Sequence, residues 1–313
     1  MGSRAFQIAI VLFWMTSMTW LVVAKLLPPL LVGEPPTYRS TMPAKDEVIA
    51  WHIYWNDEEK PLGWAATKAI EAEGGMVEIR NRVVLEELPL GELMPEWLGR
   101  VLRQRLGKLN LDAQTRMDID PLGHLDGFSS TLRLSGLSHA VRMTGHVSDG
   151  HLETKVQVGE IRYPNNFRLE PGALVSGDFS PMAVMKDLRI GQTWTQRTFS
   201  PLRPPGGPME TLRADVVRED WVEWDHRSVK TLLVEYRADS GTGFASNGPP
   251  RGRSWVLKDG RIIQQEVSLL NSKMRFIRLT PLETEPYIDK LEEDWFVSLQ
   301  PTSEELKAYE IAP

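Results

Sequence analysis

The stretch His139–Gly159, HAVRMTGHVSDGHLETKVQVG, decides the fold class because it places an Asp-Gly dipeptide between two alternating runs. Asp-Gly is the strongest short-range hairpin signal, since both residues accept the positive φ of a type I′ turn. A two-residue turn at this point pairs Ser148 with His151 and His146 with Glu153. The stretch therefore predicts an antiparallel hairpin.

A second Asp-Gly dipeptide, Asp259-Gly260, lies in RSWVLKDGRIIQQEVSL and predicts another hairpin of the same kind. Strand-like sequence precedes each hairpin, at Ser130–Gly136 and at Lys230–Ala238. Three further runs rich in β-formers lie nearer the N-terminus, at Val48–Trp55, Trp64–Ala72 and Met76–Leu88. Because strands follow strands, we expect a mainly β fold, built as one strongly curved antiparallel sheet or as two related halves.

Two helices are expected in the body and the C-terminal segment. Pro95 opens EWLGRVLRQRLGKL, whose leucines recur at helical spacing and predict one amphipathic helix. A short helix is expected near Ile288–Leu299, with Leu291, Trp295 and Leu299 as the apolar stripe that docks on the sheet.

The N-terminal run Ala5–Ala24 contains no charged residue. At helical rise, these twenty residues extend about 30 Å, the thickness of a bilayer hydrocarbon core. The length favours an uncleaved signal anchor over a cleaved signal peptide, whose apolar region is usually shorter, and over a buried helix. Val22 and Ala24, just before Lys25, keep the cleaved signal peptide open as an alternative.

These features divide the chain into four segments: an anchor (1–27), a proline-rich spacer (28–46), a β-rich body (47–282) and an acidic C-terminal segment (283–313). The spacer is expected to be extended and semi-rigid, unless its leucines stay in the membrane interface as the tail of the anchor. Because the apolar run is N-terminal, we expect the body to lie outside the cytoplasm, on the periplasmic side of an inner membrane.

Composition narrows the possible functions. The chain has 313 residues, of which 42% are apolar and 25% charged, as expected for a globular protein. Its net charge of −6 argues against nucleic acid as a partner, because that role needs excess basic charge. The absence of cysteine excludes disulfides, thiolate metal ligands and a cysteine nucleophile.

No catalytic residue, metal site or cofactor is predicted. The chain lacks the G-x-S-x-G trace of a serine hydrolase. The histidines His139, His146 and His151 lie in one hairpin, but the pairing sends His146 and His151 to opposite faces. A zinc site needs three or four convergent ligands, so a solvated pair of His146 and Glu153 is the favoured interpretation.

Two sets of side chains are candidate binding residues. Trp221 and Trp224, in REDWVEWDHR, point to opposite faces if a strand forms there, and one of them is expected to line a ligand cavity. The helix after Pro95 carries a basic face suited to anionic lipid head groups, although a solvated face is the simpler interpretation. That face consists of Arg100, Arg103, Arg105 and Lys108.

The stretch WHIYWNDEEKPLGWAATKA (51–69) resembles the opening hairpin of β-rich bacterial envelope domains that occur alone or ahead of transglutaminase-like modules. The stretches Ile190–Pro201, Leu212–Trp224 and SWVLKDGRIIQQEVSL resemble these domains too. Such domains are similar in outline to periplasmic lipoprotein carriers, in which a curved antiparallel sheet wraps an apolar cavity. The resemblance implies an envelope location and transfers no catalytic residue.

Taken together, the sequence predicts a membrane-anchored, extracytoplasmic and non-catalytic module. It would bind an apolar or lipid-like ligand or act in envelope assembly with a protein partner. One alternative is an accessory binding domain for a separate transglutaminase- or protease-like enzyme. A weaker alternative is a hydrolase with an unrecognised pair of carboxyl groups.

Overall fold

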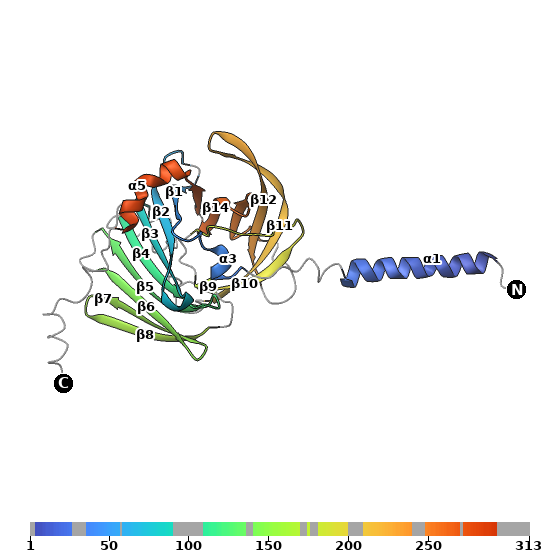
Figure 1. The fold of residues 1–313 in the computed structure, drawn as a ribbon, viewed down its shortest axis with the longest axis horizontal. Coiled ribbons are helices and arrows are strands. Elements are labelled where there is room, and N and C mark those ends of the chain that lie inside the picture. Colours follow the sequence, from blue (N-terminus) through green and yellow to red (C-terminus); the bar gives the residue numbers. More distant parts are fainter. Residues whose placement is uncertain are drawn as a thin grey trace. The chain divides into compact units, whose positions relative to one another are not determined.

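The fold is seen in a computed structural model that describes residues 4–26, 36–56, 58–89, 109–135, 140–169, 174–175, 181–199, 209–239, 248–269 and 272–292. The described chain is mainly β, as predicted, and divides into two compact units (Figure 1). We call them the β1–β8 unit, which also contains β15 and α5, and the β9–β14 unit, which also contains α1 and α3.

The β1–β8 unit is an antiparallel sheet with the strand order β8-β7-β6-β5-β4-β3-β2-β1-β15. Each strand from β1 to β8 pairs with the next strand in sequence, so the unit is an up-and-down meander that curves strongly in Figure 1. Its strands are β1 (Val48–Trp55), β2 (Gly63–Glu71), β3 (Val77–Leu88), β4 (Leu109–Ile119), β5 (Leu125–Leu134), β6 (Val141–Ser148), β7 (His151–Val158), β8 (Ile161–Arg168) and β15 (Ser272–Arg278). A single 3₁₀ turn, η2 (Glu73–Gly75), connects β2 to β3.

Alternation of side chains along β1 explains why this sequence forms a sheet with a buried face. Trp51, Ile53 and Trp55 are each at most 1% exposed and lie on the same face of the strand. The register places Ile53 opposite Phe276 of β15, which is also buried. Cross-strand pairs of large apolar side chains of this kind are what stabilises an antiparallel sheet.

The hairpin at Asp149-Gly150 forms as the sequence predicts. Asp149 and Gly150 both have positive φ, 48° and 72°, which is the signature of a type I′ turn. β6 and β7 pair Ser148 with His151 and His146 with Glu153. The predicted register is therefore confirmed.

The β9–β14 unit has the strand order β14-β13-β12-β11-β10-β9, and its pairs are antiparallel except for the parallel pair of β9 and β10. Its strands are β9 (Leu174–Val175), β10 (Thr193–Phe199), β11 (Met209–Trp224), β12 (Arg227–Ala238), β13 (Gly252–Val256) and β14 (Ile262–Leu269). Leu233, Trp255 and Ile263 form a buried cluster in this unit. Whether the two units are related halves stays a prediction.

The second Asp-Gly hairpin forms with a different turn from the one expected. Gly260 has φ 91°, but Asp259 does not have positive φ. The amide of Gly260 donates to the Leu257 carbonyl at 2.9 Å, and the amide of Leu257 donates to the Arg261 carbonyl at 2.8 Å. The turn is therefore wider than two residues and ends in a left-handed glycine. The type I′ turn of this unit lies instead at Asp225-His226, between β11 and β12, where φ is 52° and 56°.

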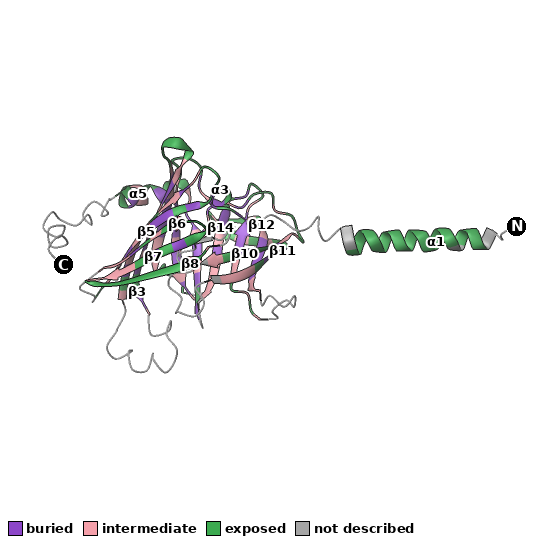
Figure 2. Ribbon diagram, turned by 90° about the horizontal axis from the view of Figure 1, so that it is seen from below, coloured by how far each residue is buried: buried purple, intermediate pink, exposed green. Residues whose placement is uncertain are grey.

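The N-terminal residues form the helix α1 (Arg4–Leu21), which continues as a π-helical turn, η1 (Val22–Leu26). The side chains described in α1 are exposed, as the colouring in Figure 2 shows. The window Phe6–Ala24 is long and apolar enough to cross a membrane, with none of it buried; a signal sequence would pass the same test.

The spacer and the helices differ from expectation in places. Residues 38–41 of the expected extended spacer form a short helix, α3 (Tyr38–Thr41), with Tyr38 and Thr41 buried. The C-terminal helix, α5 (Pro281–Glu292), begins seven residues before the expected start at Ile288, because Thr280 and Glu283 cap its first turn through mutual hydrogen bonds. The helix expected after Pro95 falls outside the described residues, except that Leu109 begins β4.

Candidate functional site

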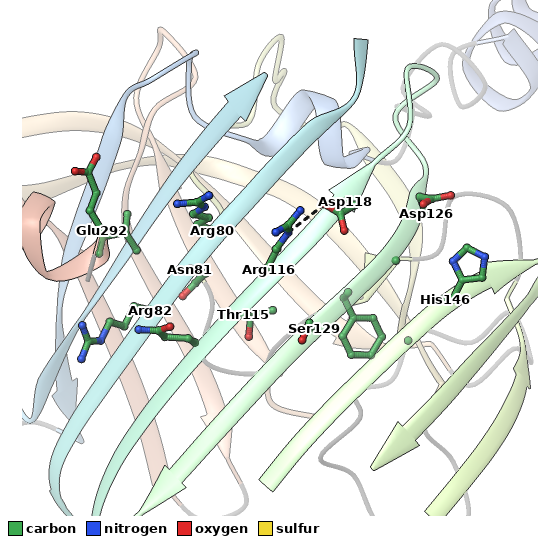
Figure 3. A pocket seen from close by; sticks show the side chains of 15 residues that line it. Arg80, Asn81, Arg82, Thr115, Arg116, Asp118, Asp126, Ser129, His146 and Glu292 are labelled. Carbon is green, nitrogen blue, oxygen red and sulfur yellow. Dashed lines mark hydrogen bonds and ion pairs between the residues drawn. The ribbon is translucent and has the colours of Figure 1, made fainter. Parts of the chain in front are cut away.

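A groove of about 420 Å³ lies on one face of the β1–β8 unit, over β3 to β6 and beside the end of α5 (Figure 3). The register brings its polar side chains together, because Arg80 pairs with Arg116 and Arg116 pairs with Ser129. Paired residues of an antiparallel sheet project from the same face. Three adjacent strands therefore contribute to one polar surface.

An ion-pair network centred on Glu78 holds two arginines that line the groove, Arg80 and Arg116. The Glu78 side chain is 11% exposed and accepts from Arg116 at 2.8 Å and from Arg80. Arg116 also contacts Asp118 at 3.4 Å. Because the arginines are paired with carboxylates, the groove presents mixed charge rather than an open anion site.

A second arginine of β3 ties the sheet to α5. Arg82 donates to Asp112 of β4 at 2.9 and 3.2 Å, and it also donates to the Lys290 carbonyl of α5. Its guanidinium lies 5.8 Å from the ring centre of Trp64. Arg82 therefore fixes the end of the helix relative to β3 and β4.

Helix α5 forms one wall of the groove through Leu291 and Glu292. Leu291 is buried against Ala50 and Ala66 of the sheet. Glu292 accepts from Lys68 at 2.9 Å, and this hydrogen bond holds the pKa of the Glu292 carboxyl below its ordinary value. The helix is thus held by an apolar contact on one side and an ion pair at its end.

A hydrogen bond in the middle of α5 completes its docking. The hydroxyl of Tyr287 lies 3.1 Å from Nε2 of His52, and the Tyr287 ring packs on Trp64 with the ring centres 4.9 Å apart. Burial lowers the pKa of His52, although the charge of Glu283 opposes that change. Burial also raises the pKa of Tyr287. Both groups are therefore neutral near pH 7.

The histidines of the first hairpin share a face, contrary to the expectation from the sequence. His146 lines the groove and pairs with Glu153, and His151 pairs with Ser148. Because residues two apart in a strand lie on one face and cross-strand partners share it, His146 and His151 project from the same face. His139 lies outside the described residues. Among the residues that the structure describes, no group of three His, Asp or Glu side chains is placed to hold a metal ion.

The two predicted ligand-binding tryptophans lie on opposite faces of β11, as the spacing indicates. Trp221 is 64% exposed. Trp224 is half-buried against the cluster of Leu233, Trp255 and Ile263, and Arg261 lies 5.9 Å from its ring centre. The structure does not bring the two rings to one site, and their role in ligand binding stays a prediction. The four basic residues Arg100, Arg103, Arg105 and Lys108 lie outside the described residues.

The arginines that line the groove were not predicted from the sequence, although a signal for them existed. In VEIRNRVV, Arg80 and Arg82 are two residues apart in a strand, so they must share a face. Arg116 could not be added from the sequence, because its place beside Arg80 depends on the register between β3 and β4.

No protein-family model matches this chain, and no curated protein matches it. Among solved structures, the chain is similar to the crystal structure of a beta-barrel-like protein of domain of unknown function DUF1849 from Brucella abortus. The two are 14% identical with a TM-score of 0.42, and the match covers 76% of this chain and 98% of that chain. A similarity of this size carries no argument about function.

Proposed function

We propose that this protein is a membrane-anchored, non-catalytic binding module whose body lies on the periplasmic side of an inner membrane. The observation that carries the proposal is the exposed apolar surface of α1. Phe13 is 75% exposed and Trp20 is 65% exposed, within a helix that has no charged side chain from Phe6 to Ala24. Such a surface is stable in a bilayer and unfavourable in water.

The groove beside α5 favours envelope assembly with a polar partner over carriage of an apolar ligand. Two of its lining side chains, Arg80 and Arg116, belong to an arginine–carboxylate network, and an apolar ligand placed there would remove these charges from water without replacing their hydration. A partner surface with polar and charged side chains would instead pair with the exposed parts of Arg80 and Arg116, whose side chains are 40% and 48% exposed.

Three described carboxyl groups have pKa values that do not suit a general acid. A general acid needs a raised pKa, but the described carboxyl groups with a clear shift, Asp120, Glu235 and Glu292, are all shifted the other way. For Glu235, burial opposes ionisation, but hydrogen bonds and charges from Arg237 and Arg253 outweigh it and lower the pKa. These groups act as ion-pair partners.

Two experiments test the proposal. Protease added outside spheroplasts should digest the body of the full chain, whereas protection until the membrane is opened would place the body in the cytoplasm. Native mass spectrometry of the full chain in detergent distinguishes the two binding roles. A lipid mass that persists across preparations would overturn the preference for a polar partner. If that lipid quenches the tryptophan fluorescence and the quenching is lost in Trp221→Ala or Trp224→Ala, the lipid binds beside the replaced tryptophan.

A further inference from the structure

One face of β10 carries polar side chains that lack hydrogen-bond partners. Trp194 and Gln196 are 4% and 6% exposed, while Thr195 and Arg197, on the opposite face of the strand, are exposed. Within the part of the chain that the structure describes, Nε1 of Trp194, Oε1 of Gln196 and Oγ1 of Thr198 are buried and make no hydrogen bond. Each of these three inward side chains of the strand thus carries a buried polar atom without a partner.

The same face of the sheet continues across β11 to β12 and β13. Trp194 pairs with Ala214, Ala214 pairs with Tyr236, and Ser254 pairs with Val234 two residues from Tyr236. The hydroxyls of Tyr236 and Ser254 are buried and also complete no hydrogen bond. Burial raises the pKa of Tyr236, and an interaction with the Ser254 hydroxyl opposes that rise, although the two hydroxyls do not meet the geometry of a hydrogen bond.

These unpartnered groups are concentrated on one face of the sheet. Seven buried side-chain atoms lack a partner among the described residues, and five of them lie on this one face of the β9–β14 unit. Native proteins satisfy buried polar atoms, and where protein groups do not reach, ordered water or a ligand does.

We propose that this face of the β9–β14 unit binds small uncharged molecules that both donate and accept hydrogen bonds. The indole can only donate, the Gln196 oxygen can only accept, and the three hydroxyls can do either. Glu210 is the cross-strand partner of Thr198, but it is ion-paired with Arg251 at 3.5 Å. A charged ligand would therefore find no free countercharge among the five groups, whereas the hydroxyl groups of ordered water or of a bound polyol or sugar would match all five.

The sign of a stability change tests whether the site is occupied. The variants Thr198→Val, Tyr236→Phe and Ser254→Ala remove one hydroxyl each with little change in shape. If a bound molecule pairs with that hydroxyl, the melting temperature of the full chain in detergent should fall by about 2–3 °C per variant. If the hydroxyls are bare, their removal relieves a desolvation penalty, so an unchanged or higher melting temperature in all three variants would overturn the proposal.

Two matched variants calibrate the measurement. Thr195→Val changes an exposed threonine on the opposite face of β10 and should leave the melting temperature unchanged. Thr231→Val removes a buried hydroxyl that donates to the Asp220 carbonyl at 3.1 Å, so it should show the fall expected for a satisfied group.

Native mass spectrometry separates the two sources of hydroxyl groups. An organic mass that is bound to the full chain and lost in Ser254→Ala identifies a polyol or sugar. A fall in melting temperature without such a mass identifies ordered water, which a high-resolution crystal structure should show beside Gln196 and Tyr236. The test is independent of membrane anchoring, because all five groups lie in the β9–β14 unit.

Discussion

Replacing Gly63 by alanine should strongly destabilise the β1–β8 unit. An added Cβ at Gly63 would lie 2.0 Å from the carbonyl oxygen of Val84 and 2.9 Å from Cα of Leu85. A carbon and a carbonyl oxygen approach no closer than about 3.3 Å. The backbones of β2 and β3 would therefore have to separate by about 1 Å, since neither atom belongs to a flexible side chain.

That separation has an energetic cost that can be estimated. Gly63 pairs with Leu85, and next to it the Glu86 amide donates to the Leu62 carbonyl at 2.8 Å. Lengthening this hydrogen bond by 1 Å breaks it. Overpacking costs about 1–3 kcal/mol and a lost backbone hydrogen bond about 0.5–1.5 kcal/mol more, so we expect a loss of about 1.5–4.5 kcal/mol.

Urea unfolding of the full chain in detergent, followed by tryptophan fluorescence, measures this loss. Gly150→Ala is the matched control: Gly150 has φ +72° and nothing lies within 4 Å of an added Cβ. Only backbone strain of about 1–2 kcal/mol is expected there. If Gly63→Ala costs no more than Gly150→Ala, the close approach of β2 and β3 at this position is wrong.

Three further predictions concern the groove, the tryptophans and α5. Glu78→Gln should cost about 1–3 kcal/mol in urea unfolding, because two arginine partners lose their buried carboxylate, and a neutral effect would show that the network adds nothing to stability. Trp224→Ala should cost about 1–3 kcal/mol through lost packing and Trp221→Ala less than about 0.5 kcal/mol, so equal losses would contradict their placement. Burial holds the pKa of His52 below its ordinary value of 6.5, so the folded state favours the neutral form. The free energy of unfolding should therefore be highest above pH 6.5 and fall as the pH is lowered further. A His52→Gln variant with the same pH profile would refute this.

The sequence predicted the elements whose chemistry is local. The Asp149-Gly150 turn and its register follow from two residues and the alternation around them, and the structure confirms both. The predicted type of the Asp259-Gly260 turn was wrong, because Asp259 does not take positive φ. The pairing of β13 with β14 also shifts by one residue between Trp255 and Val256. At Asp225-His226 the sequence signal was weak, since histidine stands where a type I′ turn usually has glycine.

The candidate sites depend on contacts that no local pattern contains. The groove needs the register of β3 with β4 and of β4 with β5, and α5 reaches it from more than 200 residues farther along the chain. The sequence WTQRT places Trp194, Gln196 and Thr198 on one face of β10. The sequence does not show whether that face is buried or solvated, and the burial of Trp194 and Gln196 in the structure decides it.

The central claim is that α1 holds a β-sheet body at a membrane, and alkaline carbonate extraction of cells that express the full chain tests it most directly. The account predicts that the protein stays in the membrane pellet with its full mass of 35.5 kDa, and that Leu12→Arg in α1 shifts it toward the supernatant. A chain shortened near Ala24 and released into the soluble fraction would contradict the claim.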